Sequence, residues 1–192
     1  MTTTIPSRED ALELFRKYNK SDALYKHALS VEAVMRYIAE KLGEDVERWG
    51  LVGLVHDIDY EMYPDQHCHK STEIFNEAGW PEELSRAVAS HGWGICSDVE
   101  PQSLMEKYLF TIDELTGLVN TTALVRPSKS VLDMTPKSVK KKWKDKRFAA
   151  GVDRSIIEKG AAILGLEISE VIDLTIMGMR TVADEIGLRG EA

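Results

Sequence analysis

Hydrophobic side chains recur at three- and four-residue intervals along almost the whole chain. The clearest case is the range 22–42, in which Leu24, Val31 and Met35 share one helical face. Gly43 follows at the position where a C-cap glycine is expected. No alternating pattern of the strand type extends beyond a few residues, so the chain is predicted to be all α.

Capping residues, glycines and prolines mark the ends of the other predicted helices. These helices are expected to begin at Ser7, Glu44, about His69, Pro81, Pro101, Thr135-Pro136, Asp153 and Ser169. Four of them are expected to end at His56, Ala78, near His91 and, for the last helix, at Gly187.

The composition is that of a folded protein. Of the 192 residues, 43% are hydrophobic and 29% are charged, without the low hydrophobicity and charge bias of a disordered chain. This length suits one compact domain, so we predict a single domain over residues 1–192.

Charge and hydropathy restrict the location and the partners. No apolar run approaches the roughly 20 residues that span a bilayer, and the first 15 residues lack the organisation of a signal peptide. The two cysteines form no CxxC pair, which agrees with free thiols in the cytoplasm. A net charge of −8 argues against binding a nucleic-acid polymer or an anionic membrane, so a small-molecule substrate is expected.

The histidines point to chemistry in the core. Only five occur, and four of them fall at the ends or on the inner faces of predicted helices between residues 22 and 120. His27 shares a helical face with Val31, and Asp113 lies one turn from Leu109, so both should face the core. A buried carboxylate beside imidazoles is costly unless it is paired or bound to metal. Nitrogen and carboxylate ligands together suit Fe, Mn, Co, Ni or Zn.

His56 and Asp57 form the most informative dipeptide. Neighbouring helical side chains diverge by about 100°, so both can reach one site only where the helix ends. The following segment, IDYEMYP, supplies such an end, and a carboxylate there can bridge two metal ions through its two oxygens.

The order His27, His56-Asp57, Asp113 resembles the H…HD…D signature of the HD superfamily of metal-dependent phosphohydrolases. His69 and His91 resemble the two extra histidines of its binuclear branch. The resemblance covers residues 22–120, with helices of about 121–187 expected to pack on this metal-binding core. That later part resembles uncharacterised predicted hydrolases of the superfamily, and the whole is expected to be a compact HD-type helical bundle.

The resemblance implies a ligand set and a reaction. His27, His56, Asp57 and Asp113 would hold one divalent metal, and Asp57 would bridge to a second held by His69 and His91. His56 and Asp57 would be the catalytic pair, and a metal-bound hydroxide would attack phosphorus.

Departures from the pattern leave alternatives open. Binuclear members often carry a double histidine where this chain has His91-Gly92, so one or two metals are considered. His67 is an alternative to His69 as a ligand, and Cys68 is a less favoured candidate. No GYP tripeptide occurs, so cleavage of cyclic dinucleotides is not assigned.

Basic residues later in the chain suit an anionic substrate. The segment 137–147 holds seven basic residues and one acid, and its ordinary role is a solvated helix face. Arg126 and Lys129 are the favoured candidates for phosphate contacts, and Lys70 is a further candidate for substrate binding.

The predicted function is hydrolysis of a phosphomonoester or phosphodiester in a nucleotide or another small phosphorylated metabolite. Two other classes are kept. One is a dinuclear iron oxygenase on the same fold, and the other is a non-catalytic module in which metal staples the helices and a nucleotide is bound. The sequence leaves the oligomeric state open.

Overall fold

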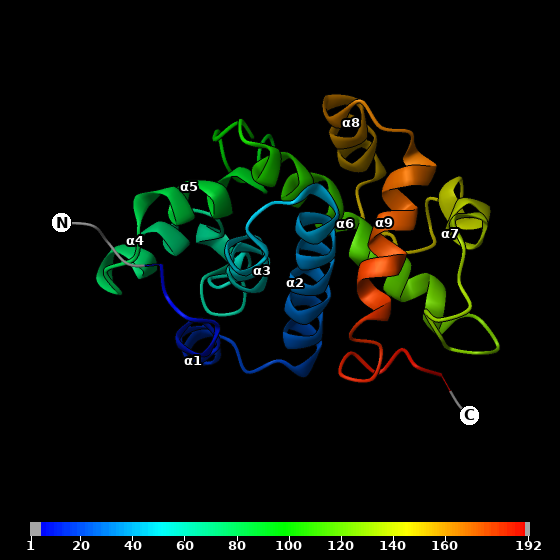
Figure 1. Cartoon of the computed structure of the whole chain (residues 1–192), viewed down its shortest axis with the longest axis horizontal. Coiled ribbons are helices and arrows are strands. Elements are labelled where there is room, and N and C mark those ends of the chain that lie inside the picture. The colour runs from blue at the N-terminus through cyan, green and yellow to red at the C-terminus, as the bar shows by residue number, and fades with distance from the viewer. Residues whose placement is uncertain (1–4, 191–192) are drawn as a thin grey trace.

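The computed structural model describes residues 5–190, and this part of the chain is helical with no strand (Figure 1). The first 15 residues are expected not to form a signal peptide, and residues 1–4 of this segment lie outside the described part of the chain. The helices are α1 (Arg8–Tyr18), α2 (Asp22–Leu42), α3 (Val46–Val55), the short 3-10 helix η1 (Pro64–Gln66), α4 (Lys70–Glu77), α5 (Glu82–Ser90), α6 (Leu104–Leu124), α7 (Pro136–Trp143), α8 (Arg154–Leu164) and α9 (Ile168–Arg180). The prediction of an all-α fold is confirmed.

Local capping chemistry explains the helix ends that the sequence predicts well. The Ser7 hydroxyl accepts from the backbone N–H of Asp10 at 3.1 Å, and the Asp10 carboxylate accepts from the backbone N–H of Ser7 at 3.1 Å. Gly43 adopts the left-handed conformation, with φ of 72°, directly after α2. Asp153 caps α8 through its carboxylate, which accepts from the backbone N–H of Ser155 at 2.9 Å.

Two predicted helix ends are wrong. The helix expected from Pro101 begins at Leu104, because Ser103 and Glu106 form a capping box that fixes the start. The last helix ends at Arg180 instead of Gly187. The hydroxyl of Thr181 donates to the carbonyl of Gly178 at 2.7 Å, which competes with continuation of the helix. The smaller shifts of one or two residues lie within ordinary boundary variation.

Helix α2 lies in the middle of the molecule and is approached closely on two sides. In Figure 1, α1, α3, α4 and α5 lie to one side of α2, and α7, α8 and α9 lie to the other. A Cβ at Gly53 of α3 would lie 3.0 Å from the Glu32 backbone, and one at Gly178 of α9 would lie 2.5 Å from Val34 Cα. Both glycines are therefore required for α3 and α9 to pack against α2.

The buried hydrophobic cluster runs from α1 to Leu188, so helices before and after residue 120 contribute to the same core. The single domain over residues 1–192 stays a prediction. Within the described residues, no helix is both long and apolar enough to cross a bilayer.

Candidate metal centre

Three packed helices bring four ligand residues together. His27 lies on α2, His56 directly follows α3, and Asp113 lies on α6. Helix α3 ends at Val55, and the turn that follows lets Asp57 reach the same point as His56, as expected from the dipeptide. His56 is fully buried and Asp57 is 7% exposed.

We call His27, His56, Asp57 and Asp113 the first ligand group. His27 Nε2 lies 3.1 Å from His56 Nε2 and 2.9 Å from Asp113 Oδ1. His56 Nε2 lies 3.2 Å from Asp113 Oδ1, and Asp57 Oδ2 lies 3.3 Å from His56 Nε2 and 3.6 Å from His27 Nε2. Ligand atoms about 2.0–2.2 Å from a tetrahedral metal are about 3.4 Å apart, so these separations suit a shared ion.

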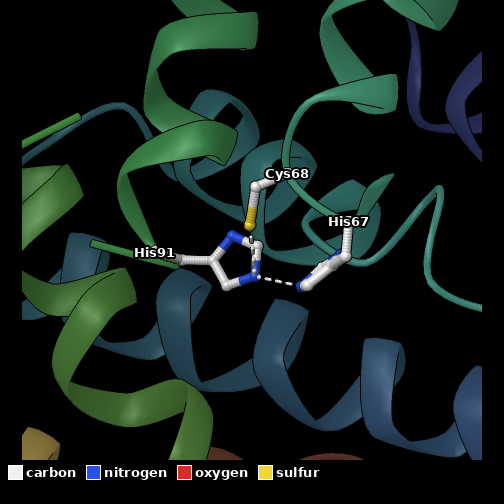
Figure 2. Close-up of side chains that lie close together, drawn as sticks. All are labelled: His67, Cys68 and His91. Atoms are coloured by element: carbon white, nitrogen blue, oxygen red, sulfur yellow. Dashed lines mark hydrogen bonds between the residues drawn. The ribbon is translucent and has the colours of Figure 1, made fainter. Parts of the chain in front are cut away.

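The second ligand group consists of His67, His91 and the other oxygen of Asp57. The Nε2 atoms of the two histidines are 3.2 Å apart, and Asp57 Oδ1 lies 3.5 Å from each (Figure 2 shows the histidines). His67 belongs to the connection between α3 and α4, whereas His91 follows α5. Asp57 thus directs one oxygen to each group.

Hydrogen bonds at Nδ1 leave Nε2 of these histidines for a ligand role. His56 Nδ1 donates to the carbonyl of Gly53 at 2.8 Å, and His91 Nδ1 donates to that of Val88 at 2.5 Å. His67 Nδ1 lies 2.7 Å from Asp59 Oδ1. Such partners fix the orientation and tautomer of an imidazole that binds metal.

Charge in the site is balanced between imidazoles and carboxylates. Burial by itself lowers the pKa of His56, but the nearby Asp57 and Asp113 hold that pKa well above its ordinary value. Burial would raise the pKa values of Asp57 and Asp113, yet the adjacent His56 keeps both pKa values below their ordinary range. A bound divalent cation would take the place of the imidazole protons beside these carboxylates.

A cavity of about 400 Å³ opens onto both groups. His27, Asp57, His67, His91 and Asp113 all contribute to its wall. The remaining wall includes side chains from several elements: Leu24, Tyr60, Ile95, Cys96, Glu114, Val152 and Ile156. A small molecule in this cavity would therefore meet both ligand groups.

The structure brings together five of the six residues predicted as metal ligands, and His67 takes the position expected for His69. His69 is exposed at the start of α4 and is not part of either ligand group. The intervening Cys68 has a φ of 68°, which turns the chain between the two histidines. The alternative of His67 is therefore the one that the geometry favours.

The predicted substrate-binding residues do not line this cavity. Arg126 donates to Asp133 at 2.6 Å and to Ser138 at 3.1 Å, beyond the end of α6. Lys70 pairs with Glu73 on α4, and Lys129 lies in the connection after α6. Because a helix rises about 1.5 Å per residue, the end of α6 is about 16 Å from Asp113 along its axis.

Sequence reasoning missed two acidic residues at the site. Asp59 is fully buried, holds His67, and accepts from the backbone N–H of Ser71 at 2.7 Å. Glu114 lines the cavity, and burial raises its pKa to about 7. The available signals were the spacing Asp57-x-Asp59 and the adjacency of Glu114 to Asp113.

An all-helical fold with histidine and aspartate side chains converging at a buried centre defines a class of candidate metal-binding proteins. Residues 24–118 match the family model described as HD domain, so this part of the chain is an HD domain. The family consists mostly of metal-dependent phosphohydrolases. No match was found among curated proteins or solved structures.

Proposed function

We propose that this protein is a binuclear, metal-dependent phosphohydrolase that acts on a nucleotide or another small phosphorylated metabolite. The observation that carries the proposal is the position of Asp57. Its two oxygens face two sets of imidazoles, with His56 Nε2 at 3.3 Å from one oxygen and His67 Nε2 at 3.5 Å from the other. Elemental analysis also identifies which of Fe, Mn, Co, Ni and Zn the protein binds.

The donor set fits divalent transition metals, since it combines imidazole nitrogen with carboxylate oxygen. When bound, two such ions would ionise water near neutral pH and neutralise charge on a phosphoryl group. The role of the chain is to hold the ligands: Asp57 spans both positions, and Asp59 fixes the ring of His67. His56 is oriented by its hydrogen bond to Gly53.

The electrostatics of the cavity explain why substrate binding would depend on metal. Asp57, Asp113 and Glu114 face it, so the metal-free cavity has carboxyl groups where a phosphate would enter. Two divalent ions would more than neutralise Asp57 and Asp113. A volume of about 400 Å³ is in the range of small-molecule sites, which supports a small phosphorylated substrate.

The first test is elemental analysis of protein purified without chelators, combined with phosphate release from a phosphodiester and a nucleotide panel. His56→Ala should lower metal content and reduce phosphate release by about 10²- to 10³-fold or more, because a buried ligand is lost. His69→Ala is the matched control and should behave like wild type, since that side chain is exposed.

The outcomes separate the rival classes. Folded protein that contains no metal and releases no phosphate would contradict the proposal. Oxygen consumption with an organic substrate, without phosphate release, would favour the dinuclear iron oxygenase. Unfolding on metal removal without any hydrolysis would favour the metal-stapled binding module.

A further inference from the structure

A buried thiol lies directly against the second ligand group. Cys68 is 1% exposed, and its Sγ lies 3.9 Å from His91 Nε2 (Figure 2). Its Sγ also lies within 4.8 Å of a ring nitrogen of His67. Cys68 is one of three non-glycine residues with positive φ in the described chain. Such a conformation is costly for a residue with a Cβ, and strained positions of this kind cluster at functional sites.

Gly92 leaves the space in which the thiol sits. A Cβ at this position would lie 2.4 Å from Cys68 Sγ and 2.3 Å from Cys96 Sγ. Any larger residue at position 92 would therefore displace sulfur from the second ligand group. Cys96 Sγ lies 2.7 Å from Cys68 Sγ, and either thiol can be the donor.

Four of the six separations among these ligand atoms are close to the edges of a tetrahedron around one ion. With metal–nitrogen bonds of about 2.05 Å and a metal–sulfur bond of about 2.3 Å, the N–N edge is about 3.4 Å and the N–S edge about 3.6 Å. The corresponding separations are 3.2 Å between the histidines and 3.9 Å from His91 Nε2 to Cys68 Sγ. Asp57 Oδ1 lies 3.5 Å from both histidines, a separation that suits a fourth ligand.

We propose that Cys68 is a thiolate ligand of the second metal position, which it forms with His67, His91 and Asp57. Binding releases the Cys68 thiol proton to solvent as the metal–sulfur bond forms. Cys96 then donates its S–H to the Cys68 sulfur. The two positions are chemically unequal: the second selects zinc or another sulfur-binding ion, and the first has only nitrogen and oxygen ligands.

This inference rests on the metal binding in the proposed function, and cobalt spectroscopy tests it separately from hydrolysis. Co²⁺ is titrated into the metal-free, reduced full chain, after thiol titration has verified two free thiols. We expect a sulfur-to-cobalt charge-transfer absorption in the near ultraviolet as the second position fills. Cys96→Ser should keep this absorption and Cys68→Ser should lose it, with circular dichroism as the test of folding.

The design does not depend on the folding of Cys68→Ser. The chain has only two cysteines, so absorption that persists in Cys96→Ser must come from Cys68. The inference is overturned if the wild-type protein binds cobalt without the sulfur absorption. It is also overturned if folded Cys96→Ser loses the band while Cys68→Ser keeps it. Phosphate release without the band contradicts only the thiolate ligand, whereas the band without phosphate release contradicts only the hydrolase.

Discussion

The two ligand groups share Asp57 but are held by different parts of the fold. His27 and Asp113 lie on α2 and α6, and His56 directly follows α3. Helices α3 and α6 both pack against α2 in the hydrophobic core. His67, in contrast, lies in the connection between α3 and α4 and is oriented by Asp59 of the same connection. Core packing thus positions the first ligand group. In the second ligand group, a hydrogen bond within the connection between α3 and α4 orients His67.

The largest expected effect comes from the residue that the groups share. Asp57→Asn keeps the side-chain volume but removes the charge and one of the two ligand oxygens. We expect loss of both metals and a fall in phosphate release of at least about 10³-fold. Elemental analysis and a phosphodiester assay measure both. Asp65→Asn, in the exposed η1 segment, is the matched control, and full metal content in Asp57→Asn would contradict the bridging role.

A second experiment separates the groups by removing one histidine from each. His27→Ala should weaken the first metal position, and His67→Ala the second, so each variant should retain about one metal fewer than wild type. Metal stoichiometry by elemental analysis distinguishes them, with His69→Ala as a control that retains both. If His69→Ala loses a metal and His67→Ala does not, the assignment of the second ligand group is wrong.

The same contrast explains how far the sequence predicts the site. His27 and Asp113 follow from their helical faces, and His56-Asp57 follows from the end of α3, because regular helices convert spacing into direction. The choice between His67 and His69 depends on the positive φ of Cys68, which no periodicity indicates.

The predicted substrate contact of Arg126 lies away from the cavity for a related reason. Arg126 follows α6 in sequence, but the helical rise carries it far from Asp113, where it pairs with Asp133. The fold class was predictable because hydrophobic spacing extends through most helices. The start of α6 at Leu104, three residues beyond the proline signal, was predictable only from the capping pair of Ser103 and Glu106.

A smaller effect is expected from the residue that orients His67. Asp59→Asn removes the carboxylate that lies 2.7 Å from His67 Nδ1. We expect the affinity of the second metal position to fall about 10- to 100-fold, with the first position little changed. Competition with a coloured chelator measures the two affinities separately. An equal loss at both positions would show that Asp59 supports the fold in general, and Asp65→Asn again provides the control.

The smallest effect is the pH dependence of the metal-free protein. Burial opposes protonation of His56 and His67, but adjacent carboxylates raise both pKa values above their ordinary value. A histidine whose pKa is raised in the folded state contributes its full stabilisation at pH values below the unfolded pKa of about 6.5. This stabilisation is lost as the pH rises through the folded pKa.

The metal-free chain should therefore lose stability as the pH rises above about 6.5, with a fall in Tm of a few degrees. Metal should reverse the trend, because ligand imidazoles must be deprotonated and affinity grows as the pH rises. Thermal unfolding monitored by circular dichroism, with and without metal, measures both slopes. His67→Ala removes one of the two imidazoles whose pKa is raised, so its slope should be shallower than that of wild type. A slope unchanged from wild type would assign the titration to His56 and would contradict a contribution from His67.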